Sequence, residues 1–541
     1  MNRNFHDVSP EWTDAVFGSV RLVIKVLIVA DGLLTFVPIL LDFSLSLFCD
    51  VLKDSALPWQ TIEVTTAHRD PPEVNTGADL RGFKFDAVKN GDPIFSIKKF
   101  DVVWLFGQAG EDPTLELATS EIDAITTFMK NGGGVFATGD HQGLGAALCG
   151  KVPRVRRMRR WHFFNLPTGE RRAPDKIGAT RIDTLRAGLS PGFQAGDQRD
   201  NVPQEIRPKF FVNSTGTAAE PHPVLALGNQ AITILPDHMH EGECVPPEEI
   251  QKKVSNNPQL GEDFPTGSNG MRAWPDVVAV STSAGGEFFV NAGIVPVEPR
   301  CFVAISAYDG HLVEFKESDQ TTRLGRIVVD SSFHHFVNVN LAGFRNGNEP
   351  DQDFEVFAQY YRNILWYLIP PDKQILQFVH MLTALRFSPP LLEDIQDLSP
   401  KKWEDVVYAG YVTQNAISEA FSATYARACA LAMVSCVRND DLRKSIQHML
   451  SLRKTRQRPE EDLLFVNSGA VLIAVLGSVM LGLASQLPQS YRTLRSALSD
   501  LRTSGQTLPG LAIAGLEHGL TQLKERFGNL ATHLNKLSNI P

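Results

Sequence analysis

The sequence predicts an α/β fold over residues 20–370, built on a doubly wound sheet, followed by an all-α region over residues 371–541. Two observations support this prediction. In the first part, short apolar runs rich in β-branched residues alternate with segments of helical spacing, whereas the second part has helical spacing alone. Strands and helices that alternate in this way are typical of right-handed βαβ units, which build a parallel sheet with helices on both faces.

Strands of the first part are expected where apolar runs stop at a glycine or a polar residue. The first four such runs are residues 23–32, 61–68, 100–107 and 135–141. Helices are expected between them, over residues 36–52 and over a segment that the glycines at 132–134 end. Later strands are expected at 231–236, 276–283, 301–310 and 326–332, the last two as antiparallel neighbours. Residues 151–220 are an expected insertion, and a helix over 354–370 closes the unit before a Pro-Pro boundary.

Polar or glycine residues follow the ends of the first four strands. In a parallel sheet the carboxyl ends of the strands meet at one edge, and ligands bind outside that edge. We therefore expect the following residues to share one edge of the sheet: Asp31, His68, Gly107, Asp140 and His141.

Four segments of the first part resemble those of the ThuA-like branch of the class I glutamine amidotransferase-like family. They are FDVVWLFG with NGGGVFATGDH (100–107 and 131–141), HPVLALG (222–228), ITILPDHMHEGE (232–243) and GRIVVDSSFHHF (325–336). The resemblance covers most of residues 20–370 and nothing after Pro371. It implies a flavodoxin-like sheet, a pocket of histidines and acidic residues, and a role of the kind often associated with sugar utilisation.

The chain departs from the amidotransferases of this family at the turn after the glycine-rich strand. Those enzymes carry a nucleophilic cysteine there, whereas this turn is Thr138-Gly139-Asp140-His141, and Cys149 lies eight residues beyond His141. Glutamine hydrolysis through a thiolate requires a cysteine beside a histidine base. We therefore expect no glutaminase activity.

Three polar clusters are the candidate catalytic groups. The residues proposed for catalysis are Asp140, His141, Asp237, His334 and His335. In this hypothesis His141 or His334 transfers a proton, and Asp140 or Asp237 is its carboxylate partner. Another interpretation is that these histidines only form hydrogen bonds with the backbone at the strand ends.

The cluster PDHMHEGE (236–243) also suits a metal. Imidazole and carboxylate together favour Zn, Fe or Mn, and an open coordination position activates water. The candidate ligands of such a divalent metal are His238, His240, Glu241 and Glu243. The alternative is acid/base chemistry by histidine and carboxylate without a metal.

Substrate contacts are expected from the glycines of the strand ends and from a basic run. The run KVPRVRRMRR (151–160) is followed by Trp161, and an Arg fork fits an anion or a phosphate. The candidate substrate-binding residues are Gly107, Gly139, Arg159 and Trp161. The favoured alternative for the run as a whole is ion pairing with the acidic surroundings.

Charge and composition limit the partners and the location. Residues 1–370 carry 34 Lys and Arg against 46 Asp and Glu, so general nucleic-acid binding is not expected. The six cysteines are scattered without a CxxC pair, which is typical of reduced thiols in an intracellular protein. The first twenty residues lack the pattern of a signal peptide, so a cytoplasmic protein is expected.

The C-terminal region contains a run of 25 uncharged residues at 463–487. This length is enough to span a bilayer, which makes membrane association one interpretation and a buried helix of a bundle the other. The helical region is expected to mediate protein contacts or oligomerisation. The favoured function is hydrolysis or related acid/base chemistry on a small polar, carbohydrate-derived substrate. The alternative is a non-catalytic ligand-sensing module coupled to the helical region.

Overall fold

The structure is a computed structural model, which describes residues 21–161, 202–435 and 468–486. Short gaps in these ranges are residues 41, 58, 72, 111–113, 141–142, 213–218, 229, 237–241, 257–262, 284–285, 291–292, 298–299, 318–319, 348, 387–393, 396, 400–401 and 421–422.

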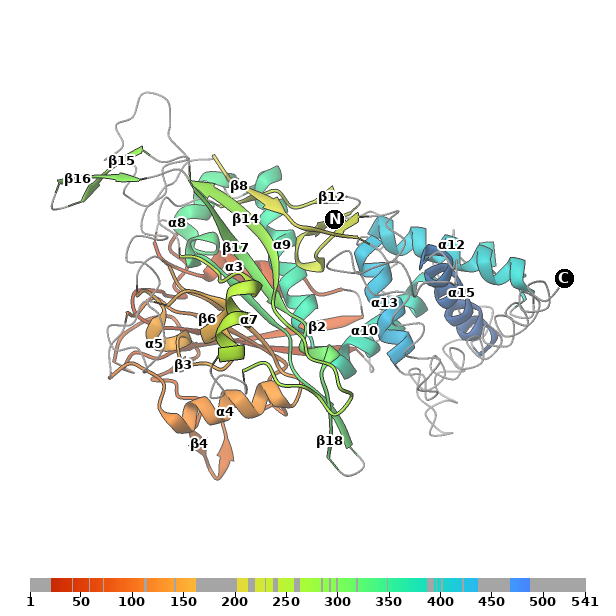
Figure 1. Cartoon of the computed structure of the whole chain (residues 1–541), viewed down its shortest axis with the longest axis horizontal. Coiled ribbons are helices and arrows are strands. Elements are labelled where there is room, and N and C mark those ends of the chain that lie inside the picture. The colour runs from red at the N-terminus through yellow and green to blue at the C-terminus, as the bar shows by residue number, and fades with distance from the viewer. Residues whose placement is uncertain are drawn as a thin grey trace.

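A ten-stranded mixed sheet forms the centre of the α/β part (Figure 1). Its parallel portion has, in spatial order, the strands β3 (Leu80–Arg81), β2 (Gln60–His68), β1 (Leu22–Ala30), β6 (Val102–Phe106), β7 (Gly134–Thr138) and β20 (Ile327–Asp330). Beyond β20 the sheet continues with four antiparallel strands, in the order β17 (Arg300–Tyr308), β14 (Asp276–Ser283), β8 (Gln204–Pro208) and β13 (Ile234–Leu235). The antiparallel pairing of β17 with β20 confirms the prediction for these two strands.

Helices cover both faces of this sheet. Helices α3 (Ser46–Lys53) and α9 (Gln352–Leu368) pack on one face, where Ile28, Trp104 and Phe136 are buried. On the other face, around Val29 and Leu105, the packed helices are α4 (Thr119–Lys130), α5 (Ala146–Cys149), α6 (Val155–Met158) and α7 (Pro247–Asn256). Alternate residues of one strand thus pack into two hydrophobic cores, one on each face of the sheet. This explains why these strands are continuous apolar runs. The α/β class is confirmed.

Small elements complete the α/β part. They are α8 (Asn338–Leu341) and the two-stranded ribbons β4–β5 (Val88–Lys89, Asp92–Pro93), β9–β10 (Phe210–Val212, Ala219–Pro221), β11–β12 (Ala226–Leu227, Gln230–Ala231), β15–β16 (Gly286–Val290, Gly293–Val297), β18–β19 (Glu314–Glu317, Gln320–Arg323) and β21–β22 (Arg345–Asn346, Glu349–Pro350).

Three elements differ from the sequence-based expectation. The strand expected at 231–236 is divided between β12, which ends at Ala231, and β13 (Ile234–Leu235). The helix expected over 36–52 begins only at Ser46, because Pro38 disfavours a helical residue before it and the preceding segment forms a closed loop in which Thr35 N donates to Phe43 O at 3.0 Å. The expected insertion at 151–220 contains β8, which pairs with β14 in the main sheet. Strand β8 has few apolar residues, so its sequence does not indicate a strand.

The helical region packs directly on the α/β part. Its described helices are α10 (Pro371–Arg386), α12 (Trp403–Ala420), α13 (Ala423–Ser435) and α15 (Ser468–Gln486), which stand together at one end of the molecule in Figure 1. Their apolar residues belong to the same core as α3 and α9. Two ion pairs cross the boundary, Lys373 with Asp101 at 2.7 Å and Arg427 with Glu220 at 2.6 Å.

Helix α15 is the described part of the 463–487 segment, and it packs closely on α12. A Cβ added to Gly477 would lie 1.9 Å from the carbonyl oxygen of Val406, and one added to Gly410 would lie 1.9 Å from that of Ile473. The small residues thus allow two helix backbones to approach each other. Within the described ranges, no helix has both the length and the apolar character that crossing a bilayer requires.

Because the two helix backbones approach so closely, an added methyl group at Gly477 is expected to destabilise the protein. Gly477→Ala is expected to lower the free energy of unfolding by about 1–3 kcal/mol, because the new Cβ overlaps the α12 backbone and outweighs the better helix propensity of alanine. Urea unfolding measures the loss. Gly110→Ala is the matched control, since its Cβ would meet only Gly143 O at 3.8 Å. Equal stability of Gly477→Ala and the wild type would contradict the α12–α15 packing.

Candidate functional site

The carboxyl ends of the parallel strands meet at one edge, as expected from the sequence. Strand register places Ala30 beside His68 and Phe106, and Phe106 beside Thr138. The residues that this register brings to the edge are Asp31, His68, Gly107, Asp140 and Asp330. His141 lies outside the described residues.

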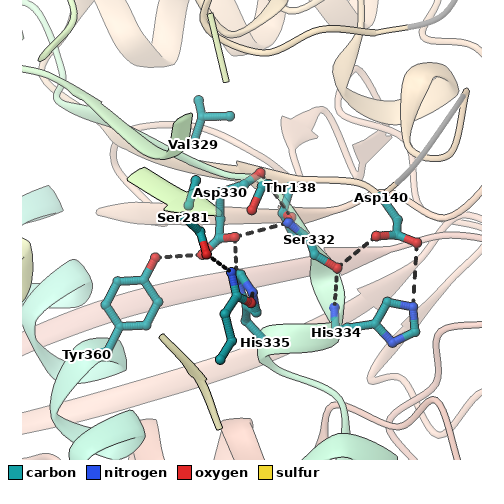
Figure 2. A network of polar contacts seen from close by, with 12 residues as sticks. Thr138, Asp140, Ser281, Val329, Asp330, Ser332, His334, His335 and Tyr360 are labelled. Carbon is teal, nitrogen blue, oxygen red and sulfur yellow. Dashed lines mark hydrogen bonds and ion pairs between the residues drawn. The ribbon is translucent and has the colours of Figure 1, made fainter. Parts of the chain in front are cut away.

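Asp140 and His334 face each other across the ends of β7 and β20 (Figure 2). The Nε2 atom of His334 lies 3.5 Å from Asp140 Oδ2. The other carboxylate oxygen, Oδ1, accepts a hydrogen bond of 2.8 Å from the Ser332 hydroxyl. All three residues are buried. The edge therefore holds an imidazole–carboxylate pair whose carboxylate has a fixed orientation.

The His334 ring is held from its other side. Its Nδ1 lies 2.9 Å from Asn340 Oδ1, and its ring packs edge-on against Phe43. Its backbone N–H donates to Ser332 Oγ at 3.1 Å, which starts the short turn Phe333–His335. Because Nδ1 donates to the Asn340 oxygen, a neutral ring directs the lone pair of Nε2 toward Asp140. The pair can thus share, donate or take up one proton.

A second carboxylate–imidazole pair, Asp330 and His335, is joined to the first through Ser332. Asp330 Oδ1 lies 2.7 Å from His335 Nδ1 and accepts from Ser332 N at 3.0 Å. Asp330 Oδ2 accepts from the Tyr360 hydroxyl at 2.6 Å, and burial raises the pKa of Tyr360 well above its ordinary value. Asp330 and His335 are fully enclosed. We interpret them as residues that position the 330–335 turn.

The protonation of His335 follows from its neighbours. Ser281 Oγ donates to the carbonyl of Glu205 at 2.8 Å and therefore accepts from Gln204 Nε2 at 3.0 Å. This fixes the Gln204 amide, so that its Oε1 faces His335 Nε2 at 3.1 Å. Both ring nitrogens of His335 thus face acceptors. A neutral ring can donate to only one of these two acceptors. A protonated ring donates to both, and it then forms an ion pair with the Asp330 carboxylate.

Arg159 joins the two loops through their backbones. Its guanidinium donates to the carbonyl oxygens of Asp140 and Ser331, at 2.7 Å each, and of Asp330 at 3.2 Å. Burial lowers the pKa of Arg159. The Trp161 ring lies 4.5 Å below the guanidinium. The described contacts of this arginine are therefore those of a clamp on the site rather than of a substrate ligand.

The glycines expected to bind substrate serve close backbone packing. A Cβ on Gly139 would lie 2.3 Å from Leu144 O, and one on Gly107 would lie 2.5 Å from the Cα of Gly145. Gly145 itself has a φ of +91°. Side chains at these positions would push apart the loops that follow β6 and β7.

Cys149 is buried next to β7. Its thiol lies 3.5 Å from the carbonyl of Thr138, and burial raises its pKa. A thiol with a raised pKa is a poor nucleophile. We therefore interpret Cys149 as a packing residue.

The candidate metal ligands are only partly described. Glu243 pairs with Arg160 at 3.2 Å, while Asp237, His238, His240 and Glu241 lie outside the described residues. Within the described residues, no group of three or more His, Cys, Asp and Glu side chains is arranged to hold a metal.

Asp31 is a further carboxyl group at this edge. Its Oδ1 accepts from the backbone N–H groups of Gln108 and Ala109, at 2.6 Å and 2.9 Å. Its Oδ2 is buried and has no hydrogen-bond partner in the described part of the chain. Burial raises the pKa of Asp31 from 3.8 to about 6.

This raised pKa predicts a pH effect on stability. The folded protein holds the Asp31 proton more tightly than the unfolded chain, so the contribution of this group to stability falls as pH rises from about 4 to about 6. The free energy of unfolding of the wild type is expected to fall relative to that of Asp31→Asn by up to about 3 kcal/mol between pH 4 and pH 7. Urea unfolding at several pH values measures this difference. A difference that does not change with pH would contradict the burial of an ionisable Asp31.

Several residues of the site carry no sequence signal. Ser332 lies inside a predicted polar tip, but Gln204, Asn340 and Tyr360 come from β8, α8 and α9 and join the network only through the fold. Known proteins supply no further guide, since no protein-family model, curated protein or solved structure matches the chain. The interpretation of the site therefore rests on its geometry.

Proposed function

We propose that residues 21–370 form a ThuA-like domain of flavodoxin-like topology that hydrolyses a small polar, carbohydrate-derived substrate by acid/base chemistry. The strand order β2-β1-β6-β7-β20 supports this, because it corresponds to the order 2-1-3-4-5 of flavodoxin-like sheets. The observation that carries the proposal is the Asp140–His334 pair, fixed by Ser332 and Asn340 at the carboxyl edge.

In this proposal His334 is the proton-transfer residue, acting together with Asp140. The pair takes a proton from the attacking water, holds it between Nε2 and the Asp140 carboxylate, and returns it to the leaving group. The Asp140 carboxylate stabilises the imidazolium that forms, since it lies beside Nε2. Asn340 keeps the proton of the neutral ring on Nδ1. The buried, poorly nucleophilic Cys149 supports chemistry without a thiolate, and hence without glutaminase activity.

A second candidate function is ligand sensing. Tyr360, which donates to Asp330, lies on α9, and α9 leads directly into α10 and shares its core. A ligand at Asp140 and His334 would displace the 330–335 turn and thereby act on the helical region. In this alternative, the helical region passes the signal to a protein partner. The scattered free cysteines support an intracellular location for either function.

One experiment separates the two functions. The full-length chain is assayed against a panel of esters, amides, lactones and glycosides, beside Asp140→Asn and the exposed control Asp92→Asn. Turnover by the wild type and by Asp92→Asn, abolished in Asp140→Asn, supports the enzyme. Saturable binding without turnover, detected by thermal shift and lost in Asp140→Asn, supports the sensor. Activity or binding that Asp140→Asn retains would contradict both.

A further inference from the structure

Five of the six basic side chains in the run 151–160 have partners within the protein. Arg156 and Arg157 bind Asp263, at 2.9 Å and 3.1 Å, and Arg160 binds Glu249 at 2.6 Å. Lys151 pairs with Glu116, and Arg159 binds backbone carbonyls. The favoured interpretation of this run, ion pairing with acidic residues, therefore holds for four of the six side chains, and carbonyls hold a fifth. Arg154 is the exception.

Arg154 is buried with two unused donors. Its side chain is 4% exposed, and its backbone has a φ of +68° while its N–H donates to Asp263 Oδ1 at 2.9 Å. Its Nε and Nη2 atoms have no hydrogen-bond partner in the described part of the chain. These two atoms lie on the same edge of the guanidinium, which is the fork that binds two oxygens of one anion.

Two further unused donors lie near Arg154. The Tyr308 hydroxyl is fully buried and lacks a partner among the described residues, as does Arg272 Nε. The ring of Phe264, the residue after Asp263, lies 5.5 Å from the Tyr308 ring and 5.6 Å from the Trp274 ring, over which Arg272 stacks at 4.5 Å. Burial raises the pKa of Tyr308 to about 12, the charge of Asp309 acts in the same direction, and the charges of Arg154 and Arg272 act in the opposite direction.

The charge at this position is positive. One carboxylate, Asp263, accepts hydrogen bonds from the guanidinium groups of Arg156 and Arg157 and from the backbone N–H of Arg154. The other nearby carboxylate, Asp309, is paired with Arg326 at 2.8 Å. A buried guanidinium with unpaired N–H groups is costly unless an acceptor satisfies it. The side chains of Arg156 and Arg272 are partly exposed, which places the cluster near the surface.

We propose that Arg154, Tyr308 and Arg272 bind the phosphoryl group of inorganic phosphate or of a phosphate monoester. A planar carboxylate has two oxygens, which the Arg154 fork alone would occupy, whereas a tetrahedral phosphoryl group has further oxygens for Tyr308 and Arg272. The site is separate from Asp140 and His334. Tyr308 pairs with Ile327 at the start of β20, whereas the proposed catalytic turn follows Asp330 at the end of that strand.

The test is isothermal titration of the full-length chain with inorganic phosphate, glycerol phosphate and acetate. The wild type is expected to bind phosphate or its ester more tightly than acetate, and the tighter of the two identifies the source of the phosphoryl group. Tyr308→Phe and Arg154→Gln are expected to weaken this binding about tenfold or more, because each removes a hydrogen bond to a charged group. The exposed control Arg81→Gln removes the same charge and is expected to leave it unchanged.

Tyr308→Phe keeps the proposal testable if Arg154→Gln does not fold. It removes only an unpaired hydroxyl, so the ligand-free variant is expected to be as stable as the wild type. Absence of phosphate and ester binding by the wild type would overturn the proposal. It would also be overturned by binding that Tyr308→Phe retains at full strength, or by binding that Arg81→Gln weakens equally, which would indicate unspecific attraction of anions.

Discussion

His334→Gln is expected to lower kcat/KM about 10²- to 10⁴-fold on a substrate that the wild-type chain hydrolyses, which is the contribution typical of a general acid/base. Glutamine keeps a polar side chain of similar reach but cannot exchange a proton. The ring nitrogen that faces Asp140 at 3.5 Å is then lost. Steady-state kinetics measure the change, with the exposed Arg81→Gln as a control.

The folding of His334→Gln must be checked beside its activity. The ring packs on Phe43 and Phe333, so a modest decrease in the melting temperature is expected. Circular dichroism at the assay temperature shows whether the variant is folded. A folded variant with wild-type kcat/KM would exclude His334 as the proton-transfer residue.

Asp330→Ala is expected to lower the free energy of unfolding by about 3–5 kcal/mol, because it leaves a buried charged partner uncompensated. His335 loses its carboxylate at 2.7 Å, and Tyr360 and Ser332 N lose their acceptor. Urea unfolding measures the loss. The matched control is Asp351→Ala, which removes only the N-cap of α9 and is expected to cost about 1 kcal/mol.

The size of the difference between these two variants tests the buried network. A loss for Asp330→Ala no larger than that for Asp351→Ala would contradict a buried ion pair between Asp330 and His335. Tyr360→Phe removes one donor only, so its cost is expected to lie below that of Asp330→Ala, at about 1.5–3 kcal/mol.

The central strands β6, β7 and β20 were predictable because they are buried on both faces. Such strands are continuous apolar runs, and their ends are marked by a change to glycine or polar residues. Strand β8 has only one buried apolar side chain, Ile206, and its place in the sheet depends on β14, far along the chain. Pairing with a strand so far along the chain leaves no local sequence pattern from which β8 could be predicted.

The position of the site was predictable, but most of its contacts were not. Topology alone brings Asp140 and Asp330 to one edge, since each lies at the carboxyl end of a parallel strand. Residue type does not reveal the partner of a side chain. Arg159 and Arg154 lie in the same basic run, yet the guanidinium of Arg159 binds four carbonyl oxygens, whereas one edge of the Arg154 guanidinium has no hydrogen-bond partner among the described residues.

The pH dependence of kcat/KM in the wild type and in Asn340→Asp tests the central claim most directly. Asn340 Oδ1 lies 2.9 Å from His334 Nδ1, and a carboxylate at this position favours the protonated ring. If His334 governs turnover, the acidic limb of the profile is expected to move to higher pH by about 1 unit or more. An acidic limb at the same pH in both proteins would contradict proton transfer by His334.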